Sequence, residues 1–293
     1  MFNFTKRAST FLLLAGLIVF AIPAAAQDQS GIIAYTAVVN GVSQINLIDL
    51  NGNATNISDG QGNDAYPSLS PDGQQVVFAS DRTGSWQLFV ADSNGGNVTP
   101  LTNNDYNNVY PAWSPDGRQI AFSSDHDGDY EIYTTDLQGN VTQLTNSDSR
   151  EWSPAWSPDG EQLAYVSDVD VDSEIYVMRV NGKGAQNITH NPTDDGNPAW
   201  SPDGTQIAFS SDRMGSLQIF VMNSDGSNVT QLTNNNNDNQ YPTWGPNGQQ
   251  IAFVSGTKKQ SALFVMNSDG SSPTQLTNAG NFAFPTWWLP QQQ

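Results

Sequence analysis

Short apolar runs recur in pairs along the chain from residue 75 to residue 265. The first run of each pair reads Gln-Val-Val-Phe-Ala or a close variant, and its apolar residues are consecutive rather than alternating. Such runs are typical of strands covered on both faces. A more polar segment, for example residues 141–145, follows each pair, as expected of a strand at the outer edge of a sheet. The paired runs lie at residues 75–79 and 87–90, 119–123 and 131–134, 162–166 and 174–177, 206–210 and 218–221, and 250–254 and 262–265.

The motif Pro-x-Trp-Ser-Pro-Asp-Gly, or a close variant, precedes each apolar pair. Ser-Pro-Asp-Gly favours a tight turn, because Pro presets φ, Asp bonds to the local backbone and Gly tolerates positive φ. The leading prolines step by 44, 43, 44, 44 and 43 residues, which is the period of a four-stranded propeller blade. They stand at positions 67, 111, 154, 198, 242 and 285.

The two ends of the repeated region are complementary fragments. Residues 31–58 read as strands two to four of a blade without a first strand, whereas residues 285–288 read as a first strand alone. Together they complete one blade, and pairing them removes the open edge of the sheet. The sequence therefore predicts an all-β, six-bladed propeller of four-stranded antiparallel blades, closed by pairing of the N- and C-terminal segments. The alternative, an open solenoid, would leave both ends uncapped.

The N-terminus has the pattern of a secretory signal peptide. Lys6 and Arg7 precede an apolar run at residues 11–22, and the small residues Ala24 to Ala26 follow. We expect residues 1–26 to be the signal peptide and residues 27–293 the propeller. The run is shorter than the about 20 residues of a spanning helix, so an uncleaved membrane anchor is the less favoured alternative. We therefore expect a periplasmic or secreted protein with no membrane span once the signal is removed.

Charge and cysteine content narrow the classes of partner. The chain has 10 Lys and Arg against 29 Asp and Glu, a net charge of −19. This charge repels phosphate backbones and anionic membranes, so we expect no nucleic-acid partner. The chain has no Cys, so its fold rests on a packed core without disulfides. We expect a monomer that binds a basic protein, a cation or a neutral ligand.

The repeats resemble those of the TolB β-propeller family, a WD40-like class. The resemblance rests on Pro-x-Trp-Ser-Pro-Asp-Gly, on Ser-Asp-Arg-x-Gly at residues 80–84 and 211–215, and on the Leu-Thr-Asn endings. It implies an exported module of the cell envelope that docks a protein, such as a Pal-like lipoprotein, at one mouth of its channel. The family protein carries an α/β domain ahead of its propeller, whereas here the signal peptide leads almost directly into the first strand. Only the partner-binding role of the propeller is therefore carried over. Similar repeats also occur in peptidase-linked propellers and in lyases of pectin fragments.

Loop length suggests which face binds the partner. The short Ser-Pro-Asp-Gly and Asn-Ser-Asp-Gly turns share one face and read as structural turns, whereas the varied loops of the opposite face are favoured for binding. There we expect an acidic collar with aromatic anchors near the channel mouth. The alternative is that the acids and amides cap the turn and the aromatics seal neighbouring blades. The candidates are Asp64, Tyr66, Asn108, Tyr110, Glu151, Trp152, Asp195, Asn239, Tyr241 and Phe284.

Two loops place acids at alternate positions, which could supply oxygen ligands to calcium. They are Asp125, Asp127, Asp129 and Glu131, and Asp168, Asp170, Asp172 and Glu174. Neither loop has EF-hand spacing, and a solvated hairpin tip is the alternative. The two histidines, His126 and His190, lie in different repeats, and no nucleophile elbow, zinc-protease or phosphate-loop motif occurs. We therefore expect a binding protein without a cofactor rather than an enzyme. The alternative is a calcium-assisted carbohydrate-binding or lyase-type propeller.

Overall fold

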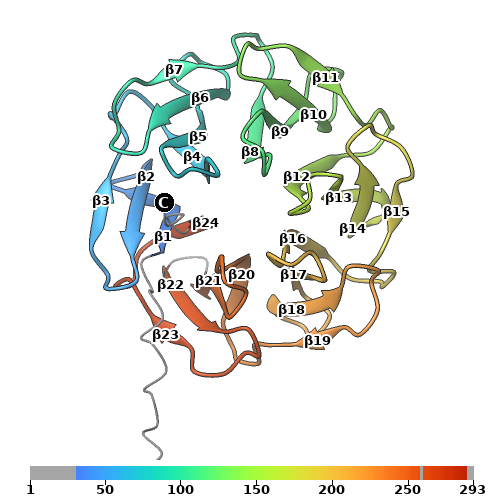
Figure 1. The fold of residues 1–293 in the computed structure, drawn as a ribbon. Helices are drawn as coiled ribbons and strands as arrows, with labels where there is room; N and C mark the ends of the chain where they lie inside the picture. Colours follow the sequence, from blue (N-terminus) through green and yellow to red (C-terminus); the bar gives the residue numbers. More distant parts are fainter. Residues whose placement is uncertain (1–30, 258–259, 289–293) are drawn as a thin grey trace, which may run out of the picture.

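The computed structural model describes residues 31–257 and 260–288, and every helix or strand in these ranges is a β-strand. The strands form six separate four-stranded sheets, antiparallel throughout. These sheets stand as blades around a common centre, with one inner strand of each facing that centre (Figure 1). The predicted all-β, six-bladed propeller is thereby confirmed.

Five blades are built from consecutive strands, innermost first. They are β4 (Asp64–Leu69), β5 (Gln75–Ser80), β6 (Gln87–Asp92) and β7 (Thr99–Pro100); β8 (Asn108–Trp113), β9 (Gln119–Ser124), β10 (Glu131–Asp136) and β11 (Val141–Gln143); β12 (Glu151–Trp156), β13 (Gln162–Asp170), β14 (Asp172–Arg179) and β15 (Gln186–Asn187); β16 (Asp195–Trp200), β17 (Gln206–Ser211), β18 (Gln218–Asn223) and β19 (Thr230–Gln231); and β20 (Asp238–Trp244), β21 (Gln250–Thr257), β22 (Gln260–Asn267) and β23 (Thr274–Gln275).

The sixth blade joins the two ends of the described chain. Its strand order is β24 (Phe282–Trp288), β1 (Ile32–Val39), β2 (Val42–Asp49) and β3 (Ala54–Asn56). Ile33 pairs with Trp287 across the junction. The Trp288 indole N–H donates to the carbonyl oxygen of Pro71 at 3.0 Å, which ties this blade to the next one. The predicted closure is therefore confirmed.

The core lies in the layers between neighbouring blades. Val77 of one blade and Phe122 of the next belong to the same buried cluster, and the other interfaces repeat the arrangement. Within blades, aromatic residues pair across the second and third strands, as Phe209 and Phe220 do at 5.8 Å between ring centroids. Since both faces of these strands are covered, their sequences are continuously apolar.

Each Ser-Pro-Asp-Gly segment forms the predicted tight turn. In the second copy the Ser114 hydroxyl donates to the Asp116 carboxylate at 2.7 Å, and the Gly117 N–H donates to the Ser114 carbonyl oxygen at 3.0 Å. Gly117 has φ = 70°, a conformation that a residue without Cβ adopts readily. The turns thus fix where each inner strand ends at the channel.

Within the ranges that the structure describes, no helix is long and apolar enough to cross a membrane. The predicted signal peptide, residues 1–26, lies outside these ranges and stays a prediction.

Candidate functional site

Each inner strand contains a bulge just before its repeat proline. The pairing register shifts there, for example between Ala65 and Ser68 in β4. The residue preceding the proline adopts a left-handed backbone in all six blades, with φ between 52° and 57°. This conformation is uncommon outside glycine, and a bulge re-aims the side chain that it carries. The six residues are Tyr66, Tyr110, Ser153, Asn197, Tyr241 and Phe284.

Four of these six residues are aromatic, and they meet inside the channel. The ring centroids of Tyr66 and Tyr110 are 4.2 Å apart, those of Tyr66 and Phe284 4.4 Å, and those of Tyr241 and Phe284 4.3 Å. We call Tyr66, Tyr110, Tyr241 and Phe284 the aromatic cluster. Trp86 packs against its edge, 6.2 Å from the Tyr66 ring. The structure therefore brings together four of the five aromatic anchors that the sequence suggested.

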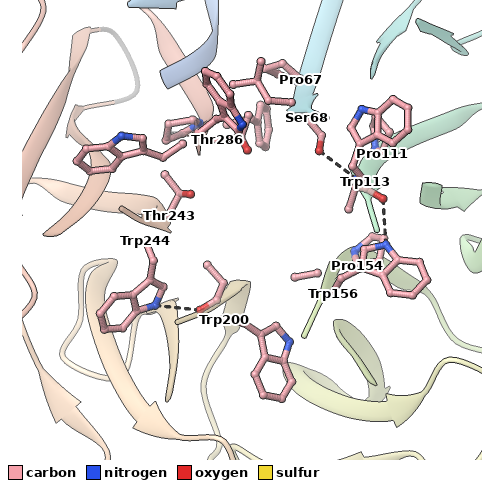
Figure 2. A pocket seen from close by; sticks show the side chains of 18 of the residues that line it. Pro67, Ser68, Pro111, Trp113, Pro154, Trp156, Trp200, Thr243, Trp244 and Thr286 are labelled. Atoms are coloured by element: carbon pink, nitrogen blue, oxygen red, sulfur yellow. Dashed lines mark hydrogen bonds between the residues drawn. The ribbon is translucent and has the colours of Figure 1, made fainter. Parts of the chain in front are cut away.

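A cavity of about 540 Å³ lies in the channel on the turn side of the aromatic cluster. Its floor is the cluster, its walls are the repeat prolines and the alanine, serine or threonine that follows each, and its rim includes prolines of the Ser-Pro turns. Figure 2 shows these side chains arranged around an open centre. Because the lining includes Pro71, Pro115 and Pro202, the cavity opens on the face of the short turns.

Hydrogen bonds between neighbouring inner strands hold the cavity wall in shape. The Trp156 indole N–H donates to the Ala112 carbonyl oxygen at 3.0 Å, and Trp244 makes the same bond to Ala199 at 3.1 Å (Figure 2). The Ser68 hydroxyl accepts from the backbone N–H of Trp113 at 3.1 Å. Trp156 and Trp244 thus tie adjacent blades together, and we expect a rigid wall.

The chemistry of the cavity is apolar and uncharged. Its lining residues are Pro, Trp, Tyr, Phe, Leu, Ala, Ser, Thr and Asn, with no carboxylate, histidine, lysine or arginine among them. Burial raises the pKa of Tyr66 and, to about 12, that of Tyr241, and the pKa of Tyr110 is raised further. These phenols therefore stay neutral and serve as hydrogen-bond groups rather than as bases. The cavity can bind, but it presents no acid–base pair for catalysis.

The predicted acidic collar at the opposite mouth is wrong. Its members Asp64, Asn108, Glu151, Asp195 and Asn239 are all buried, with at most 3% of any of them exposed. They stand at or near the start of the inner strands, between blades, where they hydrogen-bond to neighbouring side chains instead of facing solvent. Their bonds seal neighbouring blades, a role that the alternative gave to the aromatics instead.

Four seams between blades show which side chains these buried residues meet. Gln87 meets Asn108, and Gln218 meets Asn239, through amide hydrogen bonds of 3.2 and 3.0 Å. The other two seams pair acids, Glu131 with Glu151 and Glu174 with Asp195. The first residue of each pair lies at or near the start of the third strand of one blade, and the second lies on the inner strand of the next.

Arginine neutralises two of the buried aspartates. Arg213 contacts Asp195 at 3.0 Å and lies over the Phe220 ring at 4.9 Å. Arg82 contacts Asp64, also at 3.0 Å. Burial raises the pKa of Asp195 in spite of its arginine. At the Glu131–Glu151 seam, burial and the neighbouring carboxyl raise the pKa of Glu131 to about 8.

An exposed ring of acids does exist, but on the face of the short turns. Its members are the aspartates of the Ser-Pro-Asp-Gly turns, and each accepts a hydrogen bond from the turn serine, at 2.6 Å between Ser201 and Asp203. That bond, with a backbone N–H, lowers the pKa of all four carboxyls. The fifth turn has Asn247 in this place. We call the four acids the turn collar: Asp72, Asp116, Asp159 and Asp203.

Trp152 lies apart from the aromatic cluster. It is one residue earlier in its strand than Ser153, the cluster position of that blade, and it pairs with Val166 of β13. Its ring lies 5.4 Å from the guanidinium of Arg150, which itself contacts Asp168 at 2.6 Å. Trp152 is not among the residues that line the cavity.

The two acid-rich loops do not form the predicted calcium arrangement. Among the described residues, no three His, Asp or Glu side chains gather as a metal site. Asp127 accepts from Gln143 at 2.7 Å, and Asp170 accepts from Tyr176 and Asn187 at 2.5 and 3.1 Å. The remaining acids lie apart from one another. Glu131 and Glu174 are buried in their seams, and Asp129 and Asp172 lie at the loop tips. Asp125 accepts hydrogen bonds from Asn107, and Asp168 accepts them from Arg150.

Sequence reasoning missed the wall and rim of the cavity. The repeat prolines, the residues that follow them and the turn aspartates all stood in the repeat motif, which we had interpreted as purely structural. The aromatic residue just before the proline in four of six repeats, already among the candidates, signalled only the floor of the cavity. The residue before the proline varies between Tyr, Phe, Ser and Asn, and its side chain points into the channel.

Comparison with solved structures gives similar folds. The chain superposes on TolB from Acinetobacter baumannii with a TM-score of 0.78 and 24% identity, covering 89% of this chain and 67% of that one. A putative TolB from Agrobacterium tumefaciens gives 0.72 and 24%, over 86% and 90%. Oligogalacturonate lyase from Vibrio parahaemolyticus gives 0.57 and 14%, over 83% and 71%.

At the level of sequence, no curated protein matches the chain. The model of the TolB β-propeller domain matches it twice, over residues 11–151 and 140–291, which together span most of its length. This match agrees with the repeat motif, the six blades and the closing strand. The chain belongs to the TolB β-propeller domain family.

Proposed function

We propose that this propeller is an exported module that docks a protein partner at the turn-side mouth of its channel. The observation that carries the proposal is the cavity of about 540 Å³, closed at its inner end by the aromatic cluster. That volume lies in the range of about 300–1,000 Å³ typical of ligand pockets. It accommodates the apolar tip of a protein segment rather than a whole domain.

The surroundings of the cavity define the partner. Tyrosine and tryptophan at a recessed, rigid site supply large contact areas, and such residues dominate binding energy at interfaces. Around the mouth the turn collar adds four carboxylates that stay ionised at neutral pH. We therefore expect a segment with an apolar tip flanked by Lys or Arg. The acidic surface would accelerate its association, with a strong dependence on salt.

The cavity floor is not uniform. On one side the cluster position carries Ser153 and Asn197 in place of aromatic rings. These polar side chains offer hydrogen bonds to the backbone of an inserted segment, while the rings contact its apolar side chain. The site thus has a direction, which favours a partner with a defined orientation.

The family points to the kind of partner. A Pal-like envelope lipoprotein is our first candidate, and another exported protein is the second. Periplasmic or secreted location, and a monomeric state, belong to the same proposal. A lyase or carbohydrate-binding role has less support, because the cavity lining lacks both metal-binding side chains and a titratable acid–base pair.

The test is capture of envelope proteins by the purified protein, identification of the bound partner, and measurement of its Kd. Tyr110→Ala removes one ring of the cavity floor, and Ala155→Trp fills the cavity from its half-buried wall. We expect each to weaken binding by about tenfold or more, as truncating an interface hot spot does. Trp152→Ala is the matched control, since Trp152 lies outside the cavity, and it should bind as wild type.

The result also decides between the two mouths of the channel. If Trp152→Ala abolished binding while Ala155→Trp left it unchanged, the partner would occupy the face of the variable loops and the proposal would be wrong. Melting temperatures of all variants, measured alongside, separate lost binding from lost folding.

A further inference from the structure

The seam between β10 and β12 holds two carboxyl groups that lack a counter-charge. Glu131 is 0% exposed and Glu151 3%. The two side chains contact each other, and the Oε2 atom of each is buried without a hydrogen-bond partner. Leaving such atoms unmatched is costly, and buried acceptors in folded proteins are almost always satisfied. A proton shared by the two carboxyls, a water molecule or a cation would satisfy these oxygens.

The groups around the pair are mainly oxygen atoms. The Ser147 and Ser167 hydroxyls each contact Glu151 Oε1 at 2.9 Å. Glu131 Oε1 accepts from the backbone N–H of Ser147 at 2.5 Å. No basic side chain forms an ion pair with either glutamate in the described part of the chain.

The two amide seams place nitrogen donors between their side chains, although Asn239 Oδ1 is also buried without a partner. At the Gln87–Asn108 seam, Asn108 Nδ2 donates to Gln87 Oε1 at 3.2 Å and to Asn104 Oδ1 at 2.9 Å. Ser147 takes the place of Asn104 in the Glu131 blade, so the donor amides are replaced by carboxyls and a hydroxyl.

The blades with a buried aspartate use arginine instead. Arg82 follows Ser80 and Asp81, and Arg213 follows Ser211 and Asp212. In the blade of Glu151 the same place, after Ser167 and Asp168, is taken by Val169, which is 49% exposed. The Glu131–Glu151 seam therefore has neither the amides nor the arginine of its counterparts.

We propose that the β10–β12 seam binds one divalent cation of the calcium class between the carboxylates of Glu131 and Glu151. A divalent ion would balance both charges and satisfy both free Oε2 atoms. Carboxylate and other oxygen ligands suit hard cations, and calcium tolerates irregular geometry better than magnesium does. The Ser147 and Ser167 hydroxyl oxygens, which lie beside Glu151, would serve as further ligands. The solvent-exposed position of Ser147, in the loop above the seam, gives the ion a route in.

This site differs both from the calcium loops expected from the sequence and from the proposed docking site. It joins two blades, whereas the sequence pattern had suggested calcium within single acidic loops. It also lies in a seam and outside the cavity lining, so it goes beyond the proposed docking function and can fail independently of it.

The test uses the purified full-length exported protein, treated with a chelator and then titrated with CaCl₂ or MgCl₂ at pH 7. We expect calcium in 100-fold excess over its Kd to raise the melting temperature by about 5 °C or more. Glu131→Gln replaces one carboxylate with a neutral amide whose Nε2 can donate to Glu151, whereas at the sister seams the asparagine donates to the glutamine Oε1. This variant should fold, melt in chelator at or above the wild-type temperature, and bind one calcium ion fewer in calorimetry.

Two further variants keep the result interpretable. The triple variant E131Q/S147N/E151N rebuilds the Gln87–Asn104–Asn108 seam and should likewise lose the ion. Asp127→Asn, in the exposed loop, should retain it. Equal calcium stoichiometry and equal thermal shifts in wild type and Glu131→Gln would overturn the proposal. So would a wild-type protein whose melting temperature responds to pH but not to calcium, because a shared proton would then fill the seam.

Discussion

The blades that begin with β12 and β16 differ from their neighbours at two positions each. Where other blades place an aromatic ring in the channel, these two place Ser153 and Asn197. Their seams pair Glu131 with Glu151 and Glu174 with Asp195, whereas the seams that end at β8 and β20 pair amides. The backbone at these positions is nearly the same in every blade. The repeat therefore sets the geometry, and two variable positions per blade set the chemistry of the channel and of the seams.

The largest effect should come from the charged seam at β16. Arg213→Ala leaves Asp195 buried without its cation, and we expect a loss of about 3–5 kcal/mol in the free energy of unfolding, measured in urea. Arg118→Ala is the control, because the Arg118 side chain is 85% exposed and should contribute within about 0.5 kcal/mol. A loss below about 1 kcal/mol for Arg213→Ala would show that the acidic seam tolerates an unpaired charge.

A smaller effect should follow when the polar side of the channel is made aromatic. Asn197→Phe copies Phe284 at a position with a matching backbone, φ = 55° against 52°. The backbone therefore accepts the ring, while the ring removes polar groups and space from the cavity. We expect partner binding to weaken about tenfold, as loss of one interface hot spot does. An unchanged Kd would mean that the partner does not contact the polar side of the channel. The difference between the polar and the aromatic side would then matter for folding but not for binding.

The smallest effect concerns pH at the turn collar. Hydrogen bonds from the turn serines lower the pKa of these aspartates in the folded state, so the stabilisation is present above the ordinary Asp value and is lost as pH falls below about 4. Partner binding should accordingly be constant between about pH 5 and 8. Ser201→Ala should move the pKa of Asp203 back toward its ordinary value in an NMR titration while leaving Asp159 unchanged. If both aspartates moved, the shift would arise from the collective field of the face instead of from the serine.

The blade count and the closure were predictable because their signals are local and repeated. Turn residues at a fixed period mark each inner strand, and the two end fragments complement each other in sequence. Neither inference needs knowledge of which way any one side chain points.

The binding face was not predictable in the same way. Side chains two apart along a regular strand share a face, so Asp64 and Tyr66 were expected together at the mouth. The bulge between Ala65 and Ser68 breaks this alternation. Because of the bulge, Asp64 lies in the seam and contacts Arg82, whereas Tyr66 lies in the channel. The partner of each seam residue also comes from a different repeat, about 20 positions away, and sequence spacing alone does not reveal it.

The strand shared between the chain ends imposes an order on assembly. Five blades contain only neighbouring hairpins and can form as they emerge, but the blade of β1 stays incomplete until β24 arrives from the far end of the chain. Such distant pairing is entropically slow. Before β24 docks the ring is an open arc, and β1 presents an unpaired edge to a protease. Loss of β24 would thus threaten the ring more than the removal of a longer surface loop.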